Sequence, residues 1–412
     1  MRLTAEQNAP AAVAPVPVLT EKKTIDWVFL GLLGALAALG LVMVFSASVA
    51  QAERILEDAT YYGRLQGFYL LLGFVGALIM WRVPLDFLEK VSPGLLLFGF
   101  LLLFLVLLPF IGKTVNGSSR WIQIGFTIQP SEFFKLAIIV YLAGYFVRKG
   151  EQIHNDVMVF IVPLCIAAIA ALLLLLEPDF GATVVVGAII VAMMFVAGCR
   201  WVHFIATLIV IVPLGVVAIL ASPYRKSRLL SFVNPWDDPF ATDFQLTQSL
   251  IAVGRGSWDG VGLGNSVQKM AYLPEAHTDF VFAVFAEETG FIGVVILISL
   301  FALVVARCFK VARDADRAGL AYGSHIATGV GFWFGFQSFI NIGANMGVLP
   351  TKGITLPLFS YGGSSALAVC IACGLVMRVY RETNHVIAQD LARSVSTRND
   401  AAVALKLVEQ NG

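Results

Sequence analysis

The sequence predicts an all-α, polytopic membrane protein with about ten transmembrane helices. Composition is the first reason: apolar residues make up 58% of the 412 residues, charged residues only 13%, and the mean hydropathy is +0.83, far above that of soluble domains. The second is the recurrence of apolar runs long enough to cross a bilayer, at residues 27–48, 66–81, 94–112, 131–148, 157–176, 180–198, 203–221, 282–306, 322–348 and 362–380.

The runs also define the chain's organisation. The fifth and sixth are separated by the polar break Glu177-Pro178-Asp179. Residues 1–24, rich in Ala, Pro and Val, are expected to form a disordered N-terminal tail, residues 25–381 the transmembrane domain and residues 382–412 a polar C-terminal tail. An even number of spans places both tails on one side of the membrane.

Basic residues predict the orientation. One side carries Lys22, Lys23, Arg82, Lys90, Arg148, Lys149, Arg200, Arg307, Lys310, Arg313, Arg317, Arg378 and Arg381. The short loops of the other side carry only Arg54, Arg64, Lys113, Arg120 and Lys352. The positive-inside rule therefore predicts that both termini are cytoplasmic. The long loop 222–280 then faces outward, as a lid or site-forming loop.

Several classes of site are disfavoured. The net charge of +1 gives no field that would attract nucleic acid. Cys370 and Cys373 form a C-x-x-C within an apolar run, without a second pair, which favours packing over metal ligation. The glycines between 254 and 264 superficially resemble a phosphate-binding loop, but no βαβ unit surrounds them, so a dinucleotide site is excluded.

Charges near the outer ends of spans are candidates for function, because charge at membrane depth is costly. Glu132 and Lys135 follow Ser131, so if Ser131 caps a helix both lie in its first two turns. The pair either neutralises itself or presents Lys135 to an anionic substrate, and the spacing leaves both interpretations open.

Two further acidic motifs have a structural interpretation. In Glu177-Pro178-Asp179, a proline at the first helical position with acids around it favours a helix cap over a catalytic role. Glu287 and Glu288 are adjacent, so on a helix they point in different directions and at most one readily faces the cavity beside Asp279.

Asp279 lies directly before the eighth apolar run, at the expected aqueous mouth of the bundle. There it could act as a general base, or simply serve the helix dipole next to a Thr278 cap; spacing alone weighs the two equally. A second outer segment, residues 347–365, is too polar for lipid and should line a cavity. Its Lys352 either reaches a phosphate or snorkels to water.

Together these segments resemble the SEDS family (shape, elongation, division and sporulation), whose members polymerise peptidoglycan glycan strands from lipid II. The resemblance covers about residues 25–382 and rests on five ordered motifs: Gly117–Ile122, Gln129–Glu132 with Lys135, Glu177–Gly181, Leu273–Phe280 and Ser360–Ser365. The division branch of the family is favoured over the elongation branch by Asn234–Trp236, Gln245–Leu250, Gly264–Lys269 and Leu349–Gly353.

The resemblance implies an inverting glycosyltransferase with Asp279 as the catalytic residue, in the role of the base that deprotonates the acceptor's GlcNAc 4-hydroxyl. The leaving group would be undecaprenyl diphosphate. We assign substrate binding to Arg120, Glu132, Lys135, Lys352, Ser360, Tyr361 and Ser364, with Glu177, Asp179, His277 and Glu288 as secondary candidates. Arg120, Lys135 or Lys352 could stabilise the diphosphate, with or without a divalent cation (Mg or Mn); no cofactor is otherwise implied.

The implied setting is the bacterial cytoplasmic membrane at the division septum. Expected partners are lipid II, the nascent glycan strand, a class B penicillin-binding protein acting as septal transpeptidase, and other divisome membrane proteins. Two alternatives are a lipid II flippase and a divisome scaffold for a partner synthase. A flippase needs charge along its whole path, and the inner halves of the spans are poor in charge, which favours the polymerase.

Overall fold

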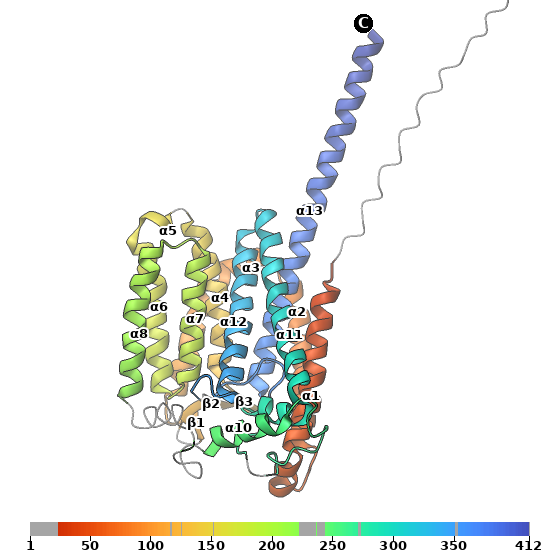
Figure 1. The fold of residues 1–412 in the computed structure, drawn as a ribbon. Coiled ribbons are helices and arrows are strands. Elements are labelled where there is room, and N and C mark those ends of the chain that lie inside the picture. Colours follow the sequence, from red (N-terminus) through yellow and green to blue (C-terminus); the bar gives the residue numbers. More distant parts are fainter. Residues whose placement is uncertain are drawn as a thin grey trace, which may run out of the picture.

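The computed structural model describes residues 24–115, 118–124, 126–150, 152–221, 236, 244–270, 273–350 and 353–411. Ten helices of 17 or more residues occur in these ranges: α1 (Trp27–Leu56), α2 (Tyr61–Arg82), α3 (Leu85–Val106), α4 (Pro130–Lys149), α6 (Val157–Leu176), α7 (Phe180–Val196), α8 (Trp201–Leu220), α11 (Val281–Arg317), α12 (Ala321–Asn345) and α13 (Gly363–Asn411). They stand side by side as one bundle (Figure 1).

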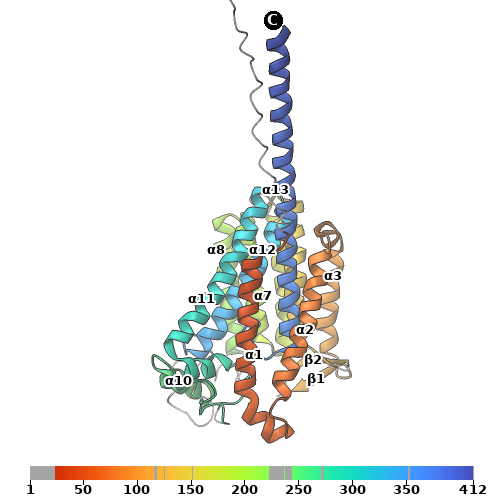
Figure 2. The ribbon, with the colours of Figure 1, turned by 90° about the vertical axis from the view of Figure 1, so that its right-hand side faces the viewer.

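The bundle has the character of a membrane domain. Seven of its helices are long and apolar enough to cross a bilayer, and α7 and α8 contain shorter apolar segments. The start of α1 and the protruding end of α13 lie at the same end of the bundle (Figures 1 and 2). The chain is therefore a polytopic, predominantly helical membrane protein, as its composition predicts.

Helix boundaries differ from the apolar runs. Helix α3 begins at Leu85, directly after Pro84, and ends at Val106, whereas the run 94–112 lies several residues later. Helix α11 continues to Arg317, and α13 continues to Asn411 through the segment expected as a tail. In α11 and α13 the apolar run marks only the part of the helix that matches lipid, because charged side chains are compatible with helix once they reach water.

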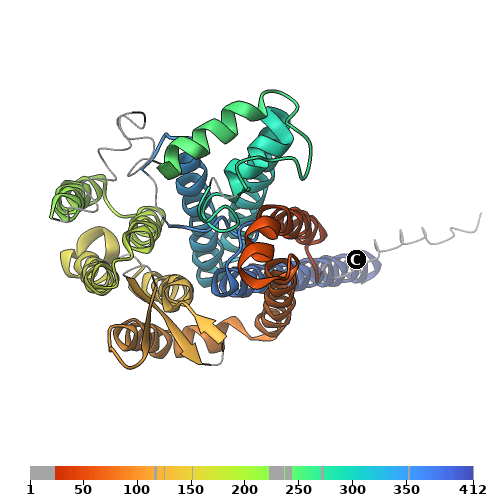
Figure 3. The ribbon, with the colours of Figure 1, turned by 90° about the horizontal axis from the view of Figure 1, so that it is seen from below.

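A small sheet was not predicted. Strands β1 (Gly112–Val115), β2 (Ser118–Ile124) and β3 (Phe126–Ile128) form an antiparallel sheet in the order β1-β2-β3 between α3 and α4. The 13-residue helix α10 (Phe244–Gly256) lies in the long loop, and the short α5 (Gln152–Asn155) precedes α6. The sheet and α10 flank one end of the bundle, hereafter the sheet end (Figure 3).

Small residues allow the last helix to pack closely against α2. A Cβ added at Gly374 would lie 2.3 Å from the Ala77 carbonyl oxygen, and one added at Gly73 would lie 2.8 Å from Cys370 Sγ. Small residues let helix backbones approach each other in membranes. Cys370, half of the C-x-x-C pair, is thus part of this packing surface.

The glycine-rich stretch after α10 docks against a break in α11. Gly290 has φ 65° and interrupts the helix, and the Phe291 amide donates to the Ser257 carbonyl at 2.9 Å. The amides of Val261 and Gly262 donate to the carbonyls of Glu287 and Glu288, at 2.9 and 3.1 Å. These glycines therefore permit close backbone contact.

Candidate active site

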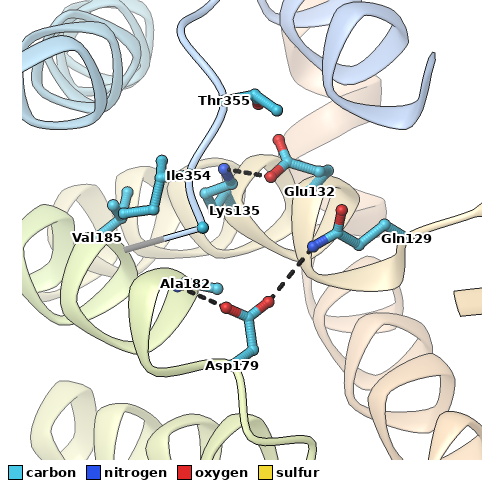
Figure 4. Close-up of a pocket in the computed structure, with 9 residues that line it drawn as sticks. Gln129, Glu132, Lys135, Asp179, Ala182, Val185, Ile354 and Thr355 are labelled. Atoms are coloured by element: carbon cyan, nitrogen blue, oxygen red, sulfur yellow. Dashed lines mark hydrogen bonds and ion pairs between the residues drawn. The ribbon is translucent and has the colours of Figure 1, made fainter. Parts of the chain in front are cut away.

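A small cavity lies where α4, α7 and the segment before α13 meet. Its lining residues are Gln129, Glu132 and Lys135; Asp179, Ala182 and Val185; and Gly353, Ile354 and Thr355 (Figure 4). Three distant motifs of the sequence thus meet in one place. Its wall carries the charged side chains Glu132, Lys135 and Asp179, which are unusual at membrane depth and mark the cavity as a candidate functional site.

Lys135 is buried, yet it has several partners. Its Nζ donates to Glu132 Oε1 at 2.8 Å and to Gln337 Oε1 at 2.7 Å, and lies 4.9 Å from the centre of the Trp333 ring. The mutually neutralised pair is therefore present, and Lys135 also lines the cavity. Its contact with an anionic substrate stays a prediction. Ser131 is not the cap of α4: the helix begins at Pro130 after Gln129, without a side-chain capping bond, because proline already supplies the N-terminal turn.

Asp179 combines a structural contact with a place in the cavity. It is the N-cap of α7, and its Oδ1 accepts the Ala182 amide at 3.0 Å, so the predicted cap is confirmed for this acid. Pro178 is not the first helical residue, since α7 begins at Phe180. The other oxygen, Oδ2, accepts from Gln129 Nε2 at 3.3 Å (Figure 4).

Arg120 reaches the same region from β2. Its Nη1 lies 4.0 Å from Asp179 Oδ1, and its Nη2 donates to the Pro178 carbonyl. A Cβ at Gly353 would be 3.8 Å from Arg120 Nη1. The unpredicted sheet therefore serves to bring a guanidinium group to the rim of the cavity.

Glu177, in the connection between α6 and α7, is fully buried, and neither carboxylate oxygen has a hydrogen-bond partner in the described structure. Burial, reinforced by the charge of Asp179 and opposed by Arg120, raises the pKa of Glu177 to about 8. The group is therefore protonated over most of the neutral range.

Asp279 is not part of the first turn of a helix. Helix α11 begins at Val281 after Phe280, and Thr278 Oγ1 donates to Glu275 Oε2 at 2.8 Å instead of capping. The cap interpretation is thus wrong. The Asp279 carboxylate points toward Gly353, where an added Cβ would be 3.2 Å from Oδ2. Asp279 and Arg120 converge on one glycine of the cavity wall.

His277 and Tyr361 form an aromatic group with Tyr62 of α2. Ring centres are 4.5 Å apart for Tyr62 and His277 and 5.4 Å for His277 and Tyr361. Burial lowers the pKa of His277, and its Nδ1 has no partner within the described residues. The His277 imidazole lies two residues before Asp279 in the chain.

Ser360 and Ser364 orient the backbone. Ser360 Oγ accepts the Leu356 amide at 2.8 Å, and Ser364 Oγ accepts the Gln129 amide at 2.9 Å while donating to the Thr127 carbonyl at 3.2 Å. The Ser364 bonds tie the first turn of α13 to β3 and to the residue before α4, whereas the Ser360 bond closes a turn within the segment before α13. Both serines therefore shape the cavity through the chain that they hold, and their assigned contact with substrate stays a prediction.

Glu287 and Glu288 point in different directions, as predicted, and both hold the segment after α10. Glu287 pairs with Arg255 and accepts the amides of Val267 and Gln268, and Glu288 accepts from Lys269 Nζ at 2.7 Å and from Ser46 Oγ at 2.8 Å. Neither belongs to the lining of the described cavity.

Lys352 lies outside the described residues. Among the residues that are described, no group of three or more His, Cys, Asp or Glu side chains is arranged to hold a metal ion. Gln337, which accepts from Lys135, was not predicted as a site residue, because it lies within an apolar run of the sequence.

A helical membrane bundle whose sheet end encloses a cavity lined by acids and a lysine has the architecture of a membrane-embedded enzyme. The chain matches the cell cycle protein family of FtsW, RodA and SpoVE over residues 26–385, and it belongs to that family.

Curated relatives agree with this membership. A probable peptidoglycan glycosyltransferase FtsW of Nitrosococcus halophilus is 51% identical over 363 residues, covering 87% of this chain and 92% of the relative. One of the same name from Coxiella burnetii is 46% identical, covering 89% of this chain and 100% of that protein.

Solved structures show the same fold. A chain from a study of polymerisation and crosslinking by a peptidoglycan synthase complex superposes with a TM-score of 0.72 at 31% identity, covering 87% of this chain and 98% of the other. The rod shape determining protein RodA of Thermus thermophilus superposes with a TM-score of 0.64 at 29% identity, over 87% and 97%.

Proposed function

We propose that this chain, a peptidoglycan glycosyltransferase of the division branch of its family, polymerises lipid II at the outer face of the bacterial cytoplasmic membrane during septal wall synthesis. The observation that carries the proposal is the convergence of the Asp279 carboxylate and the Arg120 guanidinium on Gly353, beside a cavity that contains Lys135. A base and two cations at one outward site suit transfer from a diphosphate donor.

In the proposed reaction Asp279 accepts the proton of the acceptor's GlcNAc 4-hydroxyl. The acceptor oxygen attacks the anomeric carbon of the donor sugar, the bond from that carbon to the diphosphate oxygen breaks, and undecaprenyl diphosphate leaves with the bonding electrons. Attack opposite the leaving group inverts the anomeric centre. Arg120 and Lys135 are placed to stabilise the charge that develops on the diphosphate, and Lys352 would act beside them.

The test is glycan polymerisation by the purified chain carrying Asp279→Asn. The amide keeps the size of the acid but cannot accept the proton, so we expect a loss of about 10²- to 10⁴-fold in turnover, the usual contribution of a general base. Asp259→Asn is the matched control, because Asp259 is an exposed acid of the same loop region. Near-normal polymerisation by Asp279→Asn would contradict the proposal.

The same assay distinguishes the other functions. Each variant is measured with and without a class B penicillin-binding protein, the proposed transpeptidase partner alongside other divisome membrane proteins. Polymerisation that appears only with the partner and is insensitive to Asp279→Asn would indicate a scaffold. Loss of lipid II translocation with normal polymerisation would indicate a flippase. Chelation followed by re-addition of Mg or Mn tests the proposed divalent cation.

A further inference from the structure

Helix α12 carries a row of polar side chains at intervals of four residues. Trp333, Gln337, Asn341 and Asn345 are each 0 to 1% exposed. Residues spaced by four lie on one face of a helix. None of them belongs to the cavity lining, yet their hydrogen bonds lead to its walls.

Asn341 joins two segments of the site with one amide group. Its Nδ2 donates to the carbonyl oxygen of Asp279 at 3.0 Å and to that of Ile354 at 2.6 Å. An NH₂ group has two donors, and both are used. Because both neighbours are acceptors, only the nitrogen can face them, which fixes the orientation of the amide.

The residues one turn away on each side extend this connection. Asn345 Nδ2 also donates to the Asp279 carbonyl, at 3.0 Å. Gln337 Oε1 accepts from Lys135 Nζ, while Gln337 Nε2 donates to the Thr355 carbonyl at 2.8 Å. One face of α12 therefore holds the main chain at Asp279, the wall at residues 354–355 and the head group of Lys135.

We propose that Gln337, Asn341 and Asn345, hereafter the amide frame, are positioning residues that fix the Asp279 carboxylate relative to the cavity wall at Gly353–Thr355. The inference rests on the proposed role of Asp279 as the base. Buried amides are costly unless they are bonded, and here the NH₂ groups of all three donate to backbone carbonyls of the segments that form the site. A displacement of a reacting group by about 1 Å can cost about 10²-fold in rate.

The experiment compares full-length chains in lipid bilayer discs, with lipid II as substrate. Asn341→Asp keeps the side chain's size but sets an oxygen against two carbonyl oxygens. We expect kcat to fall on the order of 10- to 100-fold with KM for lipid II nearly unchanged, because the base is displaced while substrate contacts remain. Ser338→Ala is the matched control: Ser338 is a buried neighbour on α12 whose hydroxyl has no partner in the described structure.

Asn345→Ala is the milder second variant, because the Asp279 carbonyl keeps its hydrogen bond from Asn341. We expect Asn345→Ala also to lower kcat, by a smaller factor. Melting temperatures are measured for every variant. A normal kcat in folded Asn341→Asp would overturn the proposal. If that variant does not fold, a normal kcat in Asn345→Ala would overturn it.

A separate readout does not depend on activity, so that failure of the frame and failure of the proposed function are distinguishable. The rate at which a water-soluble thiol reagent labels Asp279→Cys is measured with and without Asn345→Ala, with the native chain as the blank for its five cysteines. The frame predicts different rates in the two backgrounds, and equal rates would overturn it even if the native chain does not polymerise lipid II.

Discussion

Lys135 pairs with Glu132 and is also proposed to stabilise the diphosphate, so its two roles can be tested separately. Replacing it by methionine would leave Glu132 charged and buried, which typically costs about 3–5 kcal/mol when one partner of a buried pair is removed. We therefore expect Lys135→Met to lower both the melting temperature and the polymerisation rate. Lys352→Ala should have the smaller effect on rate.

The double variant Glu132→Gln, Lys135→Met separates the two roles. Without the unpaired carboxylate the melting temperature should recover, because the remaining groups are neutral. Polymerisation should stay low if Lys135 stabilises the diphosphate. Recovery of turnover together with stability would show that Lys135 only neutralises Glu132.

Glu177 gives a pH prediction. Its pKa is about 8 in the folded chain, against an ordinary value of 4.5, so the folded state holds a proton that the unfolded state has lost between those two values. This group's stabilising contribution is complete below pH 4.5 and is lost as the pH rises through 8. Glu177→Gln should therefore raise the melting temperature at pH 9 and change it little at pH 5.

Thermal unfolding of the detergent-purified chain at both pH values checks this expectation. The exposed acid Glu53 supplies the control Glu53→Gln, which removes a carboxylate that is already solvated. An equal effect of Glu177→Gln at pH 5 and pH 9 would contradict a raised pKa.

At the scale of elements, the sequence indicates which segments are helices better than where they begin and end. Ten apolar runs correspond to ten helices because apolar length is what a bilayer selects. The cap expected at Ser131 is absent because α4 already begins at Pro130. The cap expected at Thr278 is absent because the Thr278 hydroxyl donates to the Glu275 carboxylate instead.

The candidate site was predictable only in part. Charges such as Glu132 and Asp179 stand out because they are rare in an apolar sequence. The bonds of Asn341 do not, since an amide within a helix gives no local sign that its partners lie about 60 residues earlier, at Asp279, and 13 residues later, at Ile354. The sheet that carries Arg120 was likewise missed because its strands are short and not strongly apolar.

The break in α11 gives a prediction at this scale. A Cβ at Gly290 would lie 2.4 Å from the Gly260 amide nitrogen, and φ there is positive, so Gly290→Ala should separate the segment after α10 from α11. We expect destabilisation of more than about 1 kcal/mol, since alanine is incompatible with this conformation. Gly254→Ala is the control, because an added Cβ there would meet no atom within 4 Å beyond its own stretch of α10.

Thermal unfolding and limited proteolysis between residues 257 and 270 measure the effect. The segment should be cut faster in Gly290→Ala, whereas Gly254→Ala should be neutral or more stable, because alanine favours helix at that position of α10. Equal proteolysis of the two variants would show that the close contact at Gly290 does not hold the segment.

For the whole molecule, the distribution of charge is tied to the position of the site. The sheet end holds β2, which carries Arg120, and the starts of α4 and α7, which line the cavity (Figures 1 and 3). The last turns of α2, α4 and α11 carry Arg82, Arg148 and Arg317 and lie toward the end from which α13 protrudes. Substrates carried on an outward-facing lipid can reach the cavity only if the sheet end faces out. Orientation and function therefore depend on each other.

Cysteine labelling in intact spheroplasts tests that orientation. Leu263, in the segment after α10, is 66% exposed, and Arg313 is exposed near the end of α11. Because basic residues are retained on the cytoplasmic side, we expect an impermeant thiol reagent to label Leu263→Cys from outside and Arg313→Cys only after the membrane is opened. The native chain is the blank for its five cysteines. External labelling of Arg313→Cys with protection of Leu263→Cys would invert the topology and place the proposed base on the cytoplasmic side of the membrane.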